Sequence, residues 1–415
     1  MKSHERKPVI RFDNFSGEWI SKNLSDIATM HARIGWQNLR TSEFMDHGDY
    51  LLVTGTDFED GRINYRTCHY VTKDRYDQDK NIQLQDGSIL ITKDGTLGKV
   101  AYVQNLPMPA TLNAGVFNVL IKDKEEVDEK YLFQYLKAPF LMDYVAQRAT
   151  GGTIKHLNQN ILVDFPVELP EEKEQEKIGE YFMYLDNLIR IHQNEISRLY
   201  CVRKAMIEKM FPQDGMNTPA VRFGQYKKPW KLCKFSEIFK ERHIIDTISD
   251  EYPQLAFTIE EGVIRPEDKK TNKRDFLIID KATKKYLQTE YDDIIYNPAN
   301  VIYGAIHRNA LGKGCVSPIY KIFYTDQDST FMECIVRHPR FIKEISRSME
   351  GTVKKLRTLK PKAFLEMSAY IAPTIEEQRQ IGEYFRQMDR LIEIEKEELE
   401  KIKHIKSACL EKMFV

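Results

Sequence analysis

The sequence predicts a mixed α/β (α+β) chain. It is expected to contain two similar globular bodies, separated by two long antiparallel helices that form a coiled coil and are related by a pseudo-two-fold internal repeat. The pentapeptide IGEYF occurs at 178–182 and again at 381–385. Each copy lies in a long stretch whose apolar residues are spaced three and four apart, which is typical of a helix. Short apolar runs between Asp-Gly turns predict strands elsewhere.

The repeat extends well beyond the pentapeptide. The segments 174–211 and 377–414 align without a gap, and both end in EKMF. Two more pairs of similar segments flank the remaining sequence: 8–19 with 219–230, and 152–157 with 351–356. The sequence between these segments shows little similarity by eye. One unit of about 200 residues is therefore used twice, with a repeated frame and different contents.

The first body, 1–170, is predicted to contain strands followed by a helix. Strand-like runs separated by Asp-Gly turns occupy 50–58, 87–93 and 99–104. The segment 125–149 has a helical pattern that is interrupted near Pro139. The following segment, 171–212, is predicted to be a central spacer helix that stops at Pro212, and the 38 residues of its repeat would span roughly 57 Å.

The second half of the chain repeats this order. The second body, 213–372, has strand-like runs at 293–297 and 320–325 and a helical pattern at 331–349. The last segment, 373–415, is predicted to be the second spacer helix, which opens with the capping box Thr374-Ile375-Glu376-Glu377. An apolar stripe along a helix this long needs a partner, and the simplest partner is the other copy. The residues expected to pack between the spacer helices are Ile178, Phe182, Leu185, Ile189, Leu199, Ile381, Phe385, Met388, Ile392 and Ile402.

Composition points to a cytoplasmic globular protein without a membrane segment. The chain has 62 basic and 62 acidic residues, is 42% hydrophobic, and has no apolar run long enough to span a bilayer. Its six cysteines contain no CxxC pair, so neither a disulfide framework nor a zinc site is expected. Only the second body is clearly basic, with 27 basic and 21 acidic residues between 213 and 372.

The combination of features resembles the specificity (S) subunit of a Type I restriction–modification system. The resemblance is carried by four features: the paired IGEYF…EKMF helices, the GT[IV]K-x-L segments, the RF…W openings, and the sequence DGSILITKDGTLGKVAYV at 86–103. The resemblance covers essentially the whole chain. It implies that the bodies are target recognition domains, which bind two different halves of a bipartite site in double-stranded DNA. The helices would hold these domains at a fixed distance.

The resemblance also implies partners and a division of labour. Two methyltransferase (M) subunits would dock on this scaffold, and endonuclease–translocase (R) subunits would join them. S-adenosylmethionine, ATP and Mg²⁺ would be used by those partners, and this chain would hold no cofactor. It would direct the complex to its DNA site without being an enzyme itself.

No motif in the sequence supports a catalytic or metal site. GTLGKV at 95–100 and LGKGC at 311–315 lack the spacing of a phosphate-binding loop, and we interpret them as hairpin loops. The segment 297–300, NPAN, lacks the second proline and the aromatic residue of an adenine methyltransferase motif, so we interpret it as a turn. The ten histidines have no metal-ligand spacing.

Candidate DNA contacts are basic and amide residues on predicted loops, because phosphates and base edges are bound by such side chains. In the first body they are Arg62, Asn64, Arg66, Lys93, Lys99, Lys155, His156, Asn158 and Gln159. In the second body they are Lys269, Lys270, Lys273, Arg274, His307, Arg308, Asn309, Lys354, Lys355 and Arg357. The matching positions of Lys155 and Lys354 in the repeat favour a shared contact with the DNA backbone.

Three other functions stay open from the sequence alone. The chain could be a coiled-coil scaffold that binds only proteins, a stand-alone DNA methyltransferase, or an alternative specificity subunit from a switching locus. One geometric expectation is independent of function. Because a short segment joins Phe211 to Pro219, the repeat predicts that Phe414 lies near Pro8, so that the chain ends are close together.

Overall fold

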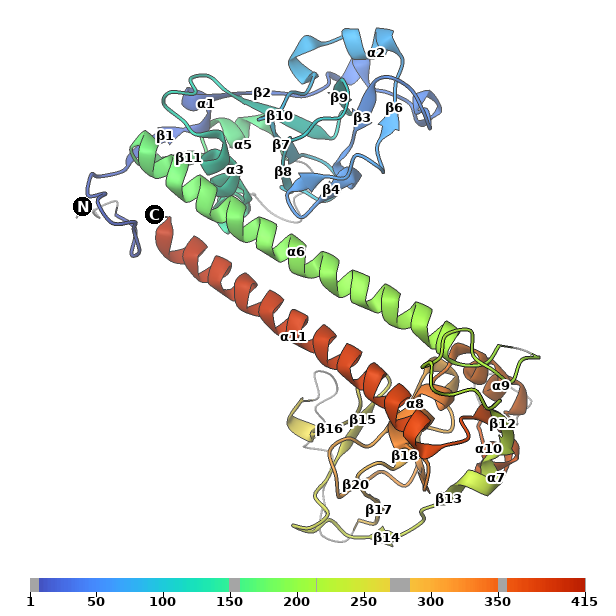
Figure 1. The fold of residues 1–415 in the computed structure, drawn as a ribbon. Coiled ribbons are helices and arrows are strands. Elements are labelled where there is room, and N and C mark those ends of the chain that lie inside the picture. The colour runs from blue at the N-terminus through green and yellow to red at the C-terminus, as the bar shows by residue number, and fades with distance from the viewer. Residues whose placement is uncertain (1–6, 149–156, 214, 269–283, 350–356, 415) are drawn as a thin grey trace. The chain divides into compact units, whose positions relative to one another are not determined.

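The computed structural model describes residues 7–148, 157–213, 215–268, 284–349 and 357–414. The chain divides into two compact units, one of residues 1–193 with 397–415 and one of residues 194–396. Two helices of 39 residues, α6 (Glu172–Met210) and α11 (Ile375–Met413), each begin in one unit and end in the other (Figure 1).

The first unit is built on a four-stranded antiparallel sheet in the order β2-β10-β7-β8. A smaller sheet has the order β6-β3-β9, with β3 and β9 parallel, and β1 pairs with β11. The strands are β1 (Ile20–Asn23), β2 (Ala28–His31), β3 (Leu51–Val53), β4 (Phe58–Glu59), β5 (Arg62–Ile63), β6 (His69–Tyr70), β7 (Ile89–Thr92), β8 (Val100–Tyr102), β9 (Ala110–Leu112), β10 (Val116–Ile121) and β11 (Pro166–Leu169). The helices of the body are α1 (Leu24–Ile27), α2 (Lys73–Asp77), α3 (Glu129–Lys137), α4 (Pro139–Arg148) and α5 (Gln159–Val163).

The second unit repeats this plan. Its four-stranded antiparallel sheet has the order β13-β21-β18-β19, a smaller sheet has the order β14-β17-β20, and β12 pairs with β22. The strands are β12 (Lys231–Lys234), β13 (Phe239–Glu241), β14 (Ile245–Asp246), β15 (Ala256–Thr258), β16 (Gly262–Ile264), β17 (Tyr286–Thr289), β18 (Ile294–Tyr296), β19 (Ile306–Arg308), β20 (Gly314–Val316), β21 (Lys321–Thr325) and β22 (Ser368–Ile371). The helices of the body are α7 (Phe235–Ile238), α8 (Ser329–Val336), α9 (Pro339–Ser348) and α10 (Pro361–Glu366). The bodies, whose sequences look unlike, thus share the topology of the four-stranded sheet. Their smaller sheets differ, since β3 pairs in parallel with β9 whereas β17 is antiparallel to both of its neighbours.

The glycine of IGEYF allows a helix of the body to approach a spacer helix closely. A Cβ atom on Gly179 would lie 2.7 Å from the backbone nitrogen of Tyr131 and 2.8 Å from Oδ1 of Asp128, the residue that caps α3. In the second unit, a Cβ on Gly382 would lie 2.5 Å from Oδ1 of Asp328, the cap of α8. The pentapeptide is therefore repeated because the same helix-to-helix contact is built twice.

A buried ion pair fixes the start of each spacer helix. Arg11 donates from Nε and Nη2 to the two carboxylate oxygens of Glu174, at 2.7 and 2.6 Å. Arg222 makes the same two bonds to Glu377, at 2.6 and 2.8 Å, and Trp230 donates a third at 3.1 Å. Neither glutamate side chain is exposed to solvent. The RF…W openings of the repeat are thereby tied to the first turn of α6 and of α11.

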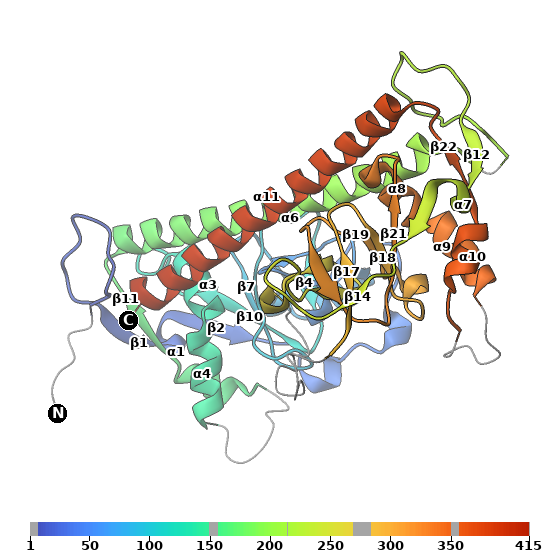
Figure 2. The same ribbon diagram turned by 90° about the horizontal axis from the view of Figure 1, so that it is seen from below.

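The far end of each spacer helix completes the core of the opposite unit. Met413 and Phe414 lie in the core of the first unit, where the Phe414 ring stacks on that of Phe182. Met210 and Phe211 lie in the core of the second unit. In each unit the helices lie side by side and antiparallel, as both views show (Figure 2). The predicted antiparallel helix pair is confirmed.

The predicted proximity of the segment that begins at Pro8 to the end of α11 is confirmed within the first unit. The backbone N–H of Ile10 donates to the carbonyl of Lys412 at 2.8 Å. The second unit has the same bond within a continuous chain, from the N–H of Val221 to the carbonyl of Lys209 at 2.9 Å. If a short linker joined the end of α11 to the segment at Pro8, the bond between Ile10 and Lys412 would lie in the same kind of connection as the bond between Val221 and Lys209.

Several local predictions are also confirmed. Thr374 accepts a hydrogen bond from the N–H of Glu377 at 3.3 Å, as expected for the capping box. The predicted Asp60-Gly61 turn joins β4 to β5, and both residues have positive φ, 48° and 84°. The helical segment 125–149 is interrupted before Pro139, where α3 ends and α4 begins.

A circular permutant tests the equivalence of the two connections. We expect a chain in which about seven residues in total join Phe414 to Pro8, and which opens between 212 and 218, to unfold within a few degrees of the parent chain. Each connection would then carry the same backbone bond. A permutant opened inside the buried strand β7 is the control, since it should lose the fold. Thermal unfolding followed by circular dichroism measures both, and loss of the fold in the first permutant contradicts the prediction.

Gly179→Ala tests the close approach of α3 and α6. Although alanine favours a helix, its Cβ would overlap the backbone of Tyr131, so we expect a loss of about 1–3 kcal/mol in the free energy of unfolding. Gly224→Ala, with no atom within 4 Å of the added carbon, is the control. Denaturant titration of both variants gives the difference, and equal stability would contradict the close contact.

Candidate nucleic-acid interface

Eight of the nineteen predicted DNA contacts lie outside the described residues. These are Lys155, His156, Lys269, Lys270, Lys273, Arg274, Lys354 and Lys355. They include both GT[IV]K segments, so the shared contact expected of Lys155 and Lys354 stays a prediction. The described candidates fall into three groups: exposed loop residues, residues packed on the helices, and residues buried in their body.

Arg66 and Lys99 are exposed on loops of the first body. The backbone N–H of Arg66 donates to Oδ1 of Asn64 at 3.2 Å, so this loop has a fixed backbone. Lys99 belongs to the hairpin between β7 and β8, where its N–H donates to the hydroxyl of Thr92 at 2.9 Å. Both side chains therefore extend from ordered loops into solvent, as a phosphate contact requires.

Lys93 lines a polar cavity of about 500 Å³ beside the same hairpin. Its ammonium lies 5.4 Å from the ring centroid of Phe117. Two other predicted contacts, Asn158 and Gln159, line this cavity and are exposed. The structure thus brings three of the candidates of the first body together with the buried Arg33.

Arg62 and Asn64 have roles inside the first unit. Arg62 lies on β5 against α6, where burial and the nearby Arg190 lower its pKa. The side chain of Asn64 donates to Glu59 at 3.2 Å and accepts from Arg66. Arg62 was predicted as a loop residue; it instead faces a spacer helix, because the tight Asp60-Gly61 turn places it in a strand.

In the second body, His307 and Asn309 are buried at 3% and 0% exposure. Burial lowers the pKa of His307 to about 4, so its imidazole is neutral. The side chain of Asn309 bonds to Thr289 and to the carbonyl of Gly312. These two candidates serve the interior of the body, and the expectation that they contact DNA is not supported.

Arg308 and Arg357 are only partly exposed. Arg308 pairs with Asp292 at 2.9 Å and with Glu333 at 3.5 Å. Arg357 donates to the carbonyl of Met349 at 3.0 Å. Both guanidinium groups already have partners within their own body.

The spacer helices bury only part of their apolar residues. Among the residues predicted to pack, Ile189, Leu199 and Ile402 are half-buried. The others are buried: Ile178, Phe182, Leu185, Ile381, Phe385, Met388 and Ile392. Several apolar side chains of the two helices stay exposed, at 39 to 59%: Tyr184, Ile191, Tyr200, Val202, Leu391, Ile394 and Ile405. Ile191 and Ile394, and likewise Val202 and Ile405, occupy equivalent positions of the repeat.

Two of the segments that superficially resemble catalytic motifs lie in a hairpin and in a turn, as predicted. Gly95 and Gly98 have positive φ in the β7–β8 hairpin, and the side chain of Asn297 accepts from the N–H groups of Ala299 and Asn300 in a turn. Among the described residues, no cluster of His, Cys, Asp and Glu side chains is arranged to hold a metal ion. None of the described helices has the length and apolar character needed to cross a lipid bilayer.

Comparison with known proteins gives a consistent result. Residues 16–200 match the family model of the Type I restriction modification DNA specificity domain. The chain is 22% identical to the Type I restriction enzyme MjaVIII specificity subunit of Methanocaldococcus jannaschii, over 94% of both chains. It is 24% identical to the putative MjaX specificity subunit of that organism, over 95% of this chain and 92% of the other.

The fold also has a counterpart among solved structures. The S subunit of a Type I restriction–modification system from M. genitalium matches with a TM-score of 0.64 and 16% sequence identity, over 99% of both chains. At this identity the match concerns the fold. It agrees with the two bodies and the two long helices described above.

Proposed function

We propose that this chain is a specificity subunit of a Type I restriction–modification system, which recognises a bipartite DNA sequence and directs partner subunits to it. One observation carries the proposal. The same core sheet is built twice on a duplicated frame, whereas the loops around the two sheets differ in sequence. Two scaffolds of one kind with different loops would bind two different half-sites.

The exposed loop residues supply the expected chemistry. Arg66 and Lys99 would contact phosphates. The cavity lined by Lys93, Asn158 and Gln159 presents an ammonium and two amides, of which that of Gln159 also donates to the carbonyl of Met30 at 3.1 Å. Amide side chains bind base edges through paired donors and acceptors. We assign phosphate contact to the first two residues and base recognition to the cavity.

The exposed apolar side chains of the spacer helices would bind the protein partners. The exposed Ile191 and Ile405 belong to the first unit, and the residues equivalent to them in the repeat, Ile394 and Val202, belong to the second. A duplicated surface of this kind would bind two copies of one protein, which we propose to be the M subunit. R subunits would join that complex.

The chemistry of the complex would reside in the partners. S-adenosylmethionine would be bound by the M subunits, and ATP and Mg²⁺ by the R subunits. The proposal for this chain is a non-catalytic one, in which it binds DNA and positions the enzymes. A protein-only scaffold and a stand-alone methyltransferase are the alternatives that the experiments below separate.

Sequencing of methylated DNA tests the proposed function. In cells that express the chain with its neighbouring methyltransferase, we expect a split motif of two short, different halves. Cells that express the methyltransferase alone should lack that motif. Methylation that is independent of this chain would contradict the proposal, and methylation by the chain alone would favour a stand-alone methyltransferase.

Arg66→Ala and Lys99→Ala test the assigned phosphate contacts. In the complex with the methyltransferase, each change should weaken binding to specific and non-specific DNA alike. Each should also reduce the slope of log affinity against log salt by about 0.9. Lys173→Ala, an exposed position on α6, is the control. Fluorescence anisotropy at several salt concentrations measures the slopes, and unchanged slopes for both variants would contradict the assignment.

A further inference from the structure

Each unit contains a short hairpin at an equivalent place. In the first unit it is β4–β5, with Asp60 and Gly61 at its tip; in the second it is β15–β16, with Ile259–Glu261 at its tip. The two hairpins pack on β8 and on β19, which are equivalent strands of the two core sheets. Asp60 and Glu260 are thus acidic residues at matching hairpin tips.

In the first unit the hairpin tip is docked on α3 and α6. Lys137 donates to the carbonyl of Asp60 at 3.2 Å, and Gln193 donates to its carboxylate at 3.2 Å. The N–H of Tyr102 on β8 donates to the carbonyl of Gly61 at 2.9 Å. A Cβ on Gly61 would lie 2.7 Å from Nζ of Lys137, so the tip leaves no space beneath it.

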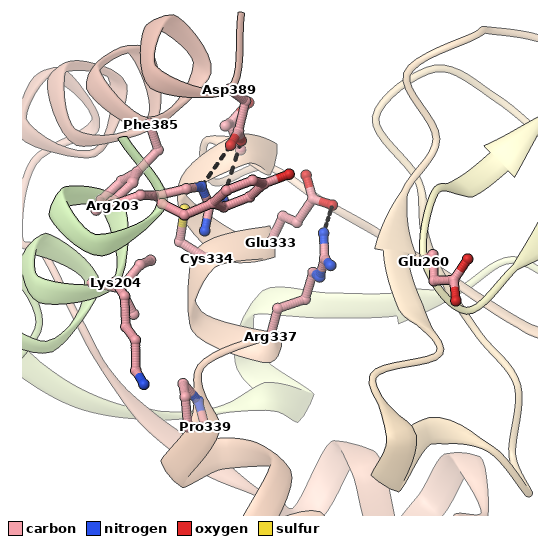
Figure 3. Close-up of a pocket in the computed structure, with 12 residues that line it drawn as sticks. Arg203, Lys204, Glu260, Glu333, Cys334, Arg337, Pro339, Phe385 and Asp389 are labelled. Atoms are coloured by element: carbon pink, nitrogen blue, oxygen red, sulfur yellow. Dashed lines mark hydrogen bonds and ion pairs between the residues drawn. The ribbon is translucent and has the colours of Figure 1, made fainter. Parts of the chain in front are cut away.

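In the second unit the corresponding space is a cavity of about 560 Å³. It is lined by α6, α8 and α11, with Arg203, Lys204, Arg337 and Asp389 among its residues. Glu260 forms the opposite wall, and no interaction joins it to Arg337 (Figure 3). The hairpin tip is therefore docked on the helices in the first unit. In the second unit it is held away from them on β19, where Nε2 of the buried His307 lies in hydrogen-bond contact with the carbonyl of Ile259 at 2.8 Å.

The positions that hold the closed tip are more basic in the second unit. Arg337, the C-cap residue of α8, is equivalent to Lys137 at the end of α3, and Lys396 on α11 is equivalent to Gln193 on α6. Lys396 pairs with the neighbouring Glu393 at 3.4 Å, and its ammonium lies 5.7 Å from the ring centroid of Tyr200. Two cations in place of one favour an acidic tip more strongly than in the first unit.

The carboxylate of Glu333 binds the two donors that a docked hairpin tip would bind, the N–H of Arg308 and the guanidinium of Arg337. The N–H of Arg308, which is equivalent to that of Tyr102, donates to Glu333 at 3.2 Å. Arg337 lies 3.5 Å from the same carboxylate, with 37% of its side chain exposed. The first unit has Phe133 at this position of the helix, and its hairpin is docked. Glu333 and the hairpin tip thus compete for one set of donors.

We propose that the β15–β16 hairpin is a movable clamp that closes onto α8 and α11, where the Glu260 carboxylate pairs with Arg337 and Lys396. Closure displaces Glu333 from Arg337 and from the N–H of Arg308. It fills the cavity and fixes the hairpin of the second body to the spacer helices, as the first body already is. This inference concerns the chain by itself and does not depend on DNA recognition.

Cysteine cross-linking of the full chain tests the clamp. A disulfide requires Cα atoms about 4.4–6.8 Å apart, so Glu260→Cys with Lys396→Cys reports closure. Asp60→Cys with Gln193→Cys, the docked pair, is the positive control, and Glu267→Cys with Lys396→Cys is the negative control. Cys201, which is exposed, is replaced by serine in every variant.

Under a mild oxidant, we expect the 260–396 disulfide to form at no less than about one hundredth of the rate of the 60–193 disulfide, as for a closed state populated at about 1% or more. Adding Glu333→Phe should raise this rate several-fold, because it removes the competing carboxylate. A rate equal to that of the negative control, and unchanged by Glu333→Phe, would overturn the proposal.

Hydrogen exchange of the chain without added cysteines gives a second test. Glu260→Lys should speed exchange of the 259–262 amides about threefold or more, since closure protects them. Adding Lys396→Glu should restore the original rate, whereas Glu267→Lys should not change it. If none of the three changes alters the exchange rate of the 259–262 amides, the hairpin does not close and the proposal is wrong.

Discussion

The ion pair between Glu174 and Arg11, with its copy between Glu377 and Arg222, is the interaction on which each unit depends. Both glutamates are fully buried, and removing one partner of such a pair costs about 3–5 kcal/mol because a charge is left without compensation. The neighbouring Gln175 adds bonds to the N–H of Asp128 and to the carbonyl of Pro170. One dipeptide thus joins the segment before β1, the cap of α3 and the start of α6.

The two units are also completed by each other's helix. The segment EKMF that ends α11 contributes Phe414 to the core of the first unit, and the segment that ends α6 contributes Phe211 to the core of the second. A body therefore acquires its full core only when both spacer helices are present and antiparallel. This constraint explains why the ends of the repeated segment are retained, even though they are far apart in the sequence.

The parts of this structure that local chemistry determines were predictable from the sequence, whereas contacts between segments far apart in the sequence were not. The Asp60-Gly61 turn follows from the need for positive φ, and α6 and α11 follow from a periodic pattern that continues for ten turns or so. Arg62 looked like an exposed loop residue, yet it faces α6, because that neighbour is more than 100 residues away in the sequence. The role of Gly179 was also missed: its repetition within IGEYF was visible, but the approach of α3 was not.

The charges on the spacer helices show why one helix sequence can pair with itself. Asp186 of α6 pairs with Lys406 of α11 in the first unit, and Asp389 of α11 pairs with Arg203 of α6 in the second. In both helices the basic residue follows the aspartate by 17 positions. In an antiparallel pair, each aspartate then meets the cation of the other helix, as in a two-fold interface. The basic residue differs between the copies, but its charge and position do not. A duplicated helix thus specifies its own partner, direction and register, while the bodies attached to it are free to diverge.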